Sequence, residues 1–286
     1  MKGKSILRLL CVLLFAVVPA AAVSETEVKS SFADFGGTKV HYREAGKGSQ
    51  ALVFVHGWTC NADFWKDSYS AFPEYRVIAV DLPGHGKSDK PQATYSMAYF
   101  ARSIDAVMKA AKVNRAVIAG HSMGTPVARQ FYRLYPQKLL GIVVVDGTLR
   151  TMGTPEQMQA FMQPLVTNFK ENGPKFLDGM LVPVKDEKLK KSIRETMLSA
   201  PEHVAVSAMR EMNDQAIWTD DKVDRPVLAV MAQSEWWPPN TRERFAEVAP
   251  NMEWHMWTGV SHFLQMERPS EFNSLVRAFI KKNKLL

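Results

Sequence analysis

The chain has 286 residues, of which 46% are hydrophobic and 10% aromatic, and its formal net charge is +7 at pH 7. This length and apolar content suffice for one large globular domain with a sizeable core, and they exclude a disordered chain. The charge is mild and no basic stripe or nucleic-acid-binding motif is present, so we expect no nucleic-acid partner.

Residues 1–22 resemble a secretory signal peptide. Basic residues are followed by an apolar run at 9–18 and by the small residues of a cleavage site at 19–22. The apolar run is shorter than the about 20 residues needed to span a bilayer, so we expect export to the periplasm or the outside, without stable membrane insertion. Removal of three basic residues with this segment would lower the net charge from +7 to +4.

From about residue 25 the sequence alternates strand-like and helix-like segments. Residues 31–43 predict a β-hairpin around Gly36 and Gly37. Further strands are predicted at 52–55, 77–80, 116–119, 142–145, 227–231 and 252–257. With helical patterns between them, these runs predict an α/β fold with a mostly parallel sheet covered on both faces. Reactive groups in such sheets lie in loops at the carboxyl ends of the strands.

Residues 150–224 interrupt this alternation with successive helical patterns and no convincing strand. Thr154 and Gln157 predict an N-cap and a capping box at the start of the first helix. We therefore predict a helical cap at 150–224, inserted into a core formed by 25–149 and 225–286. Met158 and Met162 in its first helix either pack within the cap or line an adaptable apolar substrate pocket.

The strongest motif is Gly-His-Ser-Met-Gly at residues 120–124, between a predicted strand and a predicted helix. A serine in such a turn needs flanking glycines, because side chains there would collide with the neighbouring strand and helix. Ser122 is therefore the candidate nucleophile. The backbone N–H of Met123 is a candidate donor to an oxyanion. We expect His121 to be structural.

A serine nucleophile needs a base, and a third group must orient that base. Among the histidines that follow the motif, His203 lies in the predicted cap and His255 in the last predicted strand. His262 follows that strand in a loop, so it is the candidate base.

Two carboxylates could orient His262, since both follow predicted strands between the serine and the histidine. Glu235 comes just after the run at 227–231, and Asp146 ends the run at 142–145. We favour Glu235 because its side chain is longer and its loop precedes the histidine loop by one strand, with Asp146 as the alternative acid.

The loop after the run at 52–55 supplies the second candidate oxyanion donor, the backbone N–H of Trp58. We expect the Trp58 side chain to face the substrate pocket. Trp236 is a further candidate wall of that pocket, with packing as the alternative. Cys60 is interpreted as a small buried packing residue.

Together the segments HGW, DLPGHGKS, GHSMG and SHF resemble the α/β-hydrolase fold superfamily, in its broad esterase, lipase and peroxidase-like group with a helical cap. The resemblance covers the chain from about residue 31 and implies an eight-stranded type of sheet. Most members carry an aspartate in a glycine-containing turn where this chain has Ala232 to Glu235, a turn with a glutamate and no glycine.

The resemblance implies a serine hydrolase that forms an acyl-enzyme with a small-molecule ester or lactone carrying an apolar moiety. We expect no metal and no organic cofactor, and the sequence predicts no oligomeric state. Lactone hydrolysis, C–C bond hydrolysis and perhydrolysis use the same residues and remain open, and a non-catalytic binding module is the alternative from another class.

Overall fold

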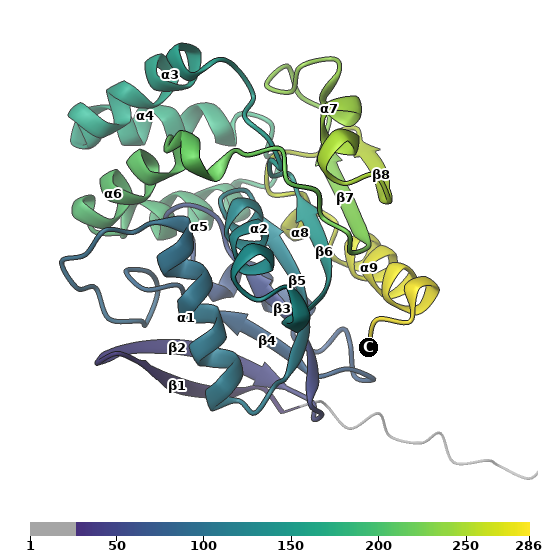
Figure 1. The fold of residues 1–286 in the computed structure, drawn as a ribbon. Helices are drawn as coiled ribbons and strands as arrows, with labels where there is room; N and C mark the ends of the chain where they lie inside the picture. The colour runs from purple at the N-terminus through teal and green to yellow at the C-terminus, as the bar shows by residue number, and fades with distance from the viewer. Residues whose placement is uncertain (1–26) are drawn as a thin grey trace, which may run out of the picture.

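The structure, a computed structural model, describes residues 27–286. The predicted signal peptide lies outside the described residues. An eight-stranded sheet forms the centre, with the strand order β1-β2-β4-β3-β5-β6-β7-β8 (Figure 1). The strands are β1 Lys29–Phe35, β2 Thr38–Ala45, β3 Gln50–Val55, β4 Val77–Val80, β5 Arg115–His121, β6 Leu139–Val145, β7 Val227–Ala232 and β8 Met252–Trp257.

The direction of the strands confirms the predicted mostly parallel sheet. The β1–β2 hairpin is antiparallel and β2 is antiparallel to β4, whereas every pair from β4 to β8 is parallel. The carboxyl ends of β3, β5, β6, β7 and β8 therefore lie along one edge of the sheet, and the loops that follow these strands carry the candidate site.

Helices cover both faces of the sheet. Successive side chains of a strand point to opposite faces. In β5, Ile118 accordingly packs in the same core cluster as Phe100 of α1 and Val127 of α2, whereas Val117 packs in the cluster that contains Phe272 of α9. The helices of this body are α1 Met97–Ala110, α2 Gly124–Leu134, α7 Thr241–Val248, α8 Leu264–Glu267 and α9 Pro269–Asn283, with 3₁₀ turns at Ala62–Ser68 and Pro136–Lys138.

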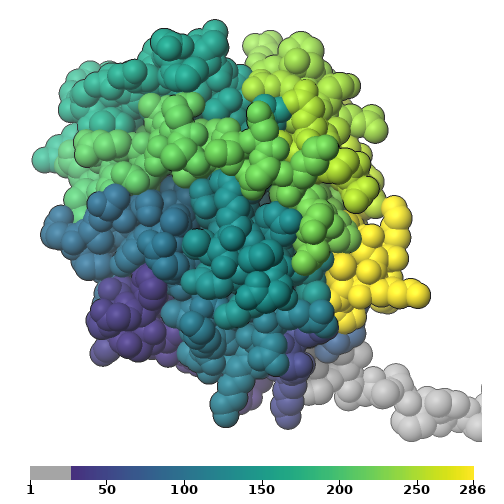
Figure 2. Space-filling view, in the orientation of Figure 1, coloured from purple at the N-terminus to yellow at the C-terminus, as the bar shows by residue number. Residues whose placement is uncertain are grey.

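Four helices and a short 3₁₀ turn (Gln215–Ile217) lie between β6 and β7, and we call the four the cap helices. They are α3 Pro155–Thr167, α4 Phe169–Leu181, α5 Glu187–Leu198 and α6 Glu202–Met212. Thr154 and Gln157 form the predicted capping box at the start of α3. The cap helices form a layer over the body, and α6 packs against α3, α4 and α1 (Figures 1 and 2).

Buried Arg129 of α2 forms hydrogen bonds with both of the segments that connect the cap helices to the body. Its guanidinium donates to the carbonyl oxygen of Leu149 at 2.5 Å, before the cap, and to that of Asp221 at 3.0 Å, after it. Within residues 27–286, no helix has both the length and the apolar character required to cross a membrane.

Candidate active site

Ser122 occupies a sharp turn between β5 and α2. Its φ of 52° lies in the left-handed region that side-chain-bearing residues rarely adopt. The flanking glycines make the turn possible: a Cβ on Gly120 would lie 2.3 Å from the carbonyl oxygen of Gly124, and a Cβ on Gly124 would lie 2.4 Å from that of Val55. The structure thus gives a steric reason for both glycines of the motif.

Ser122 lies between the ends of two neighbouring strands. Its backbone N–H donates to the carbonyl oxygen of Val145, the last residue of β6, at 3.0 Å. On the other side, a Cβ added to Gly57 would approach the Cβ of Ser122 to 3.0 Å, so the loop after β3 passes close to the serine. The hydrogen bond between Ser122 and Val145 puts Asp146, the residue after Val145, at the same edge of the sheet as Ser122.

His262 contacts Asp146. The His262 Nδ1 lies 2.6 Å from Oδ2 of Asp146, and the other carboxylate oxygen accepts from the Ala232 N–H at 2.8 Å and from the indole N–H of Trp237 at 3.1 Å. Asp146 is 4% exposed, so its carboxylate is held by these groups rather than by solvent. Its φ of 41° is also left-handed, a conformation that aspartate tolerates better than most residues.

A carboxylate that accepts from Nδ1 keeps a neutral imidazole in the tautomer whose Nε2 is free to accept a proton. The structure records no hydrogen bond between the Ser122 hydroxyl and the His262 ring. Such bonds commonly tighten only when substrate is bound.

The structural role expected for His121 is visible in its contacts. Its Nε2 lies 2.8 Å from the carbonyl oxygen of His262, and the two rings are 4.7 Å apart. Burial, together with the nearby His262 ring, lowers the pKa of His121 well below its usual value, so its neutral Nε2–H donates to that carbonyl. His121 thereby fixes the backbone of the loop that carries His262 next to the loop that carries Ser122.

The geometry favours the alternative acid, Asp146, over the preferred Glu235. Glu235 is exposed, and no hydrogen bond or ion pair joins it to His262, whereas Asp146 makes that contact. The reason is topological: β6 is the neighbour of β5, so the residue after β6 lies beside Ser122, while the loop after β7 turns outwards through Glu235. The same loop contributes the Trp237 indole to Asp146, a contact that sequence reasoning missed.

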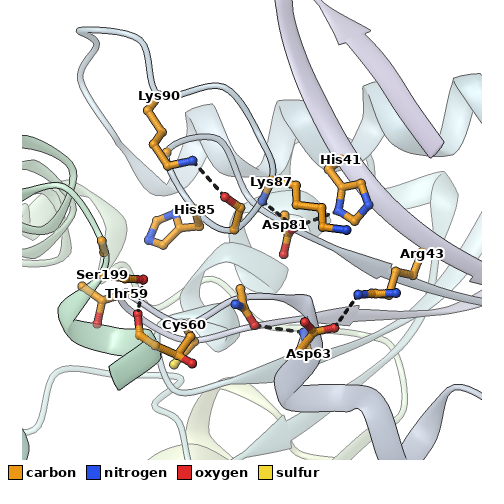
Figure 3. Close-up of a pocket in the computed structure, with 15 residues that line it drawn as sticks. His41, Arg43, Thr59, Cys60, Asp63, Asp81, His85, Lys87, Lys90 and Ser199 are labelled. Carbon is orange, nitrogen blue, oxygen red and sulfur yellow. Dashed lines mark hydrogen bonds and ion pairs between the residues drawn. The ribbon is translucent and has the colours of Figure 1, made fainter. Parts of the chain in front are cut away.

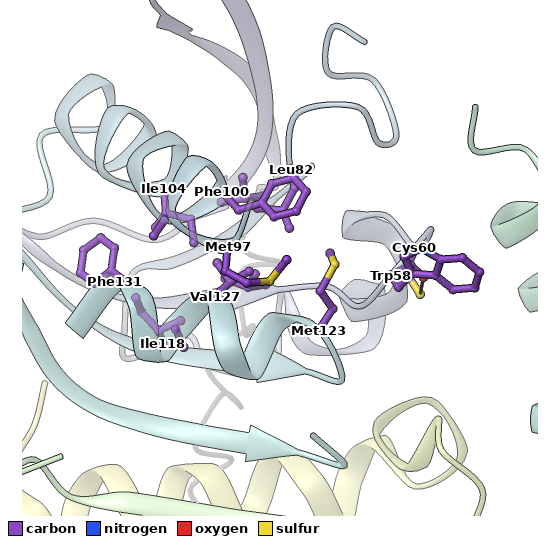
Figure 4. Packing of buried hydrophobic residues seen from close by; sticks show 14 of the residues in the cluster. Trp58, Cys60, Leu82, Met97, Phe100, Ile104, Ile118, Met123, Val127 and Phe131 are labelled. Atoms are coloured by element: carbon purple, nitrogen blue, oxygen red, sulfur yellow. Dashed lines mark hydrogen bonds between the residues drawn. The ribbon is translucent and has the colours of Figure 1, made fainter. Parts of the chain in front are cut away.

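Trp58 and Met123, the candidate oxyanion donors, follow β3 and Ser122, respectively, and their side chains are buried. Both side chains belong to one apolar cluster (Figure 4). Among the described residues, neither backbone N–H donates to another protein group. Both are therefore available to a substrate oxygen.

The Trp58 side chain joins its loop to the cap helices. Its indole N–H donates to the carbonyl oxygen of Ala205 in α6 at 2.8 Å, and its ring packs edge-on against Phe169 and Phe176 of α4. The ring thus contacts the cap helices. That it also lines a substrate pocket stays a prediction.

The remaining candidates for a pocket wall lie in or against the cap helices. Met158 and Met162 are 8% and 7% exposed and pack in the apolar cluster shared by the cap helices and the body. Trp236 is 49% exposed and packs edge-on against Phe161 and Phe176. Packing is thus observed for all three, and contact with substrate stays a prediction.

Cys60 is buried and its thiol donates to the carbonyl oxygen of Trp58 at 3.4 Å. Burial raises the pKa of this thiol, so it stays protonated and is a poor nucleophile. Within residues 27–286, no group of three or more histidine, cysteine, aspartate or glutamate side chains is arranged to hold a metal ion.

Comparison with known proteins supports the fold and the general class of reaction. A family model described as alpha/beta hydrolase fold matches residues 50–196. The chain belongs to the alpha/beta hydrolase fold family. This finding confirms the resemblance seen in the motifs and agrees with the eight-stranded sheet.

Relatives of this alpha/beta hydrolase are named for different activities. A 2-hydroxy-6-oxononadienedioate/2-hydroxy-6-oxononatrienedioate hydrolase of Paraburkholderia phymatum is 27% identical, over 86% of this chain and 92% of that protein. A non-heme chloroperoxidase of Streptomyces lividans is 28% identical, over 86% and 97%. The solved structure of Est816, described as an N-acyl homoserine lactone degrading enzyme, is 27% identical with a TM-score of 0.74, over 87% and 100%. The chain is a hydrolase of this fold, and the bond it cleaves has to be argued from its own residues.

Proposed function

We propose that this protein hydrolyses carboxylic esters through Ser122 as nucleophile, His262 as general base and Asp146 as the carboxylate that orients the base. The observation that carries the proposal is the 2.6 Å contact between His262 and Asp146, at the sheet edge where Ser122 occupies its strained turn. Nucleophile, orienting acid and base follow β5, β6 and β8 at one edge of the sheet, which is the arrangement expected for acyl transfer.

In the proposed reaction, His262 Nε2 takes the proton of Ser122 while Oγ bonds to the ester carbonyl carbon. The carbonyl oxygen becomes an oxyanion, which the N–H groups of Trp58 and Met123 stabilise. Collapse of this intermediate breaks the C–O bond, and the alcohol leaves with the proton from His262. Water then attacks the acyl-enzyme with His262 as base, which releases the carboxylic acid and restores Ser122.

Charge favours an uncharged ester over a dicarboxylate substrate. The described groups around the three residues are mostly apolar or aromatic, such as Trp58, Met123 and Trp237. Two arginines near the base of the cap helices are already paired with carboxylates: Arg129 binds Asp221, and Arg150 binds Asp220 and Glu247. A buried dianion would need unpaired cations, because an uncompensated charge is costly to remove from water.

A lactone is the second candidate substrate. It is an internal ester that the same residues would open by the same steps, and the likeness to Est816 at 27% identity over 87% of the chain favours it. Hydrolysis of an open-chain ester separates its acyl and alcohol parts into two products, whereas the two parts of a lactone remain joined in one hydroxy acid.

We also propose that the protein is exported and loses its first residues, on the basis of the segment 1–22. Intact mass of the protein recovered from the periplasm or medium tests this. Retention of Met1 to Ala22 would contradict it.

A panel of p-nitrophenyl esters of increasing acyl length, run beside N-acyl homoserine lactones and a dienedioate, tests the substrate class. We expect turnover of uncharged esters, and hydrolysis of the dienedioate faster than that of every ester and lactone would contradict the proposal. Ser122→Ala serves as the control for background hydrolysis on each substrate.

A further inference from the structure

Exposed cations gather at the end of the molecule where the parallel strands begin, opposite the candidate active site. They come from the loop between β2 and β3, from the segment between α1 and β5 and from the end of α9. We call this surface the basic end and define it by five exposed residues: Lys47, Lys112, Arg115, Lys281 and Lys284.

Hydrogen bonds and packing bring these three segments together. The Asn114 N–H donates to the carbonyl oxygen of Ser49 at 2.8 Å, so the loop that carries Lys47 lies beside the segment 112–115. A Cβ added to Gly141 of β6 would lie 3.0 Å from a methyl group of Leu285, which puts the end of α9 at the start of the neighbouring strand. The three segments are far apart in the sequence, which is why the sequence itself shows no basic stripe.

The carboxylates at this end of the molecule are already paired with other cations. The pairs are Glu27 with Lys29, Glu44 with Arg76, Glu74 with Arg277, Asp105 with Lys109 and Lys138, Asp224 with Arg225, and Glu253 with Lys282. Among residues 27–286, the five cations of the basic end form no ion pair, so their charge is not compensated locally.

Helix termini explain only part of this charge. Cations are favoured at helix C-termini, which accounts for Lys112 after α1 and Lys284 after α9. Lys47 lies in a loop and Arg115 is the first residue of a strand, so no helix terminus accounts for them. A surface that attracts anions therefore needs a further reason.

The opposite end of the molecule has mixed charge. Basic side chains there line a cavity together with carboxylates, and Arg43 pairs with Asp63 at 2.9 Å (Figure 3). Lys90 donates to the carbonyl oxygen of Gly86 at 2.8 Å in the same cavity. That side also carries exposed carboxylates that form no ion pair among the described residues, namely Glu156, Glu235 and Glu243. Unpaired charges of both signs thus occur there, whereas those of the basic end are all positive.

The described chain also starts at the basic end. Lys29, the first residue of β1, lies opposite Glu44, which in turn lies opposite Ile78 near the start of β4. Figure 1 shows the start of β1 and the C-terminus at the end of the molecule away from the cap helices. Residues 23–28 alone separate the expected signal peptide from β1, a span of at most about 25 Å. While the signal peptide is attached, it therefore holds the basic end close to the membrane.

We propose that the basic end binds the surface of an anionic phospholipid membrane, with the candidate active site facing away from it. Cations spread over the starts of several strands suit an extended layer of lipid phosphates better than one small anion. Each lysine or arginine near such a surface strengthens binding about fivefold. The cellular setting rests on the export proposed above, and the binding itself depends neither on export nor on the proposed hydrolysis.

Co-sedimentation of the purified mature protein with vesicles tests the proposal. We expect binding to vesicles of equal parts phosphatidylcholine and phosphatidylglycerol at about 0.1 M salt, and release at about 1 M salt, where charges are screened within about 3 Å. Vesicles of phosphatidylcholine alone should not bind. Equal binding to both kinds of vesicle, or none to the anionic kind, would overturn the proposal. Tighter binding to soluble heparin than to anionic vesicles would overturn it as well, because the partner would then be a polyanion rather than a membrane.

Two triple variants with the same net charge assign the binding to the basic end. Replacement of three of its lysines by glutamine, at 47, 112 and 284, should weaken binding to anionic vesicles at least about tenfold. The control replaces three exposed lysines elsewhere, Lys66, Lys185 and Lys188, and should weaken it less than about threefold. Thermal unfolding checks that both variants are folded, which we expect because all six side chains are exposed. Equal weakening in the two variants would show that net charge alone drives binding and would refute the proposal.

Discussion

Replacement of Asp146 by asparagine is the most discriminating change in the candidate site. One carboxylate oxygen accepts two N–H groups, from Ala232 at 2.8 Å and Trp237 at 3.1 Å, while the other contacts His262 Nδ1 at 2.6 Å. In Asp146→Asn the amide oxygen should keep the two N–H donors. The amide NH₂ then faces His262 and stabilises the tautomer with hydrogen on Nε2, which cannot accept a proton from Ser122.

The expected loss in kcat is large because the wrong tautomer removes the base rather than weakening it. A change of this kind costs as much as about 10⁴-fold in a serine protease, or about 5.4 kcal/mol. The matched change, Glu235→Gln, removes the charge of an exposed carboxylate in the neighbouring loop and should leave kcat unchanged.

Initial rates on a p-nitrophenyl ester at pH 8 measure both variants against wild type. Thermal unfolding should accompany them, since Asp146 is buried and the comparison requires folded protein. A greater loss in Glu235→Gln than in Asp146→Asn, or an Asp146→Asn rate within about tenfold of wild type, would refute the reasoning.

Two further predictions concern the half-buried Trp237 and the buried histidines. Trp237→Phe removes the indole donor to the Asp146 carboxylate and should lower kcat about tenfold in steady-state assays. Trp236→Phe, at an exposed neighbour with no such hydrogen bond, should leave kcat unchanged. Equal effects of the two changes would contradict the role given to Trp237. Urea unfolding between pH 7.5 and 4.5 should show stability that is complete above about pH 6.5 and is lost as the pH falls, by about 1.4 kcal/mol per unit for each buried histidine, because the unfolded chain gains protons that the folded state excludes. The histidines concerned are His56, His85 and His121, whose pKa values are lowered by burial in the folded protein. A free energy of unfolding that does not change between pH 7.5 and 4.5 would contradict these lowered pKa values.

Local sequence patterns predicted most of the fold because its elements follow from short-range chemistry. Apolar runs gave the strands, Thr154 and Gln157 marked the start of α3, and the glycines around Ser122 marked a turn that no larger residue could form. His262 was identifiable because it follows the last strand of a parallel sheet, where loops gather at one edge.

The choice of acid depended on long-range geometry that no short segment contains. Both Asp146 and Glu235 follow strands, and only the adjacency of β5 and β6 puts Asp146 beside Ser122. The direction in which the loop after β7 leaves the sheet, with Trp237 turned towards Asp146 and Glu235 towards solvent, is likewise set by tertiary packing.

Covalent labelling of Ser122 tests the central claim most directly. A fluorophosphonate probe bonds only to a serine whose hydroxyl is activated by a positioned base, so peptide mass analysis of the labelled protein reports the nucleophile itself. We predict stoichiometric labelling at Ser122, none in Ser122→Ala, and a much slower reaction in Asp146→Asn. An unlabelled Ser122 in folded protein, or equal labelling of wild type and Ser122→Ala at another residue, would contradict the account.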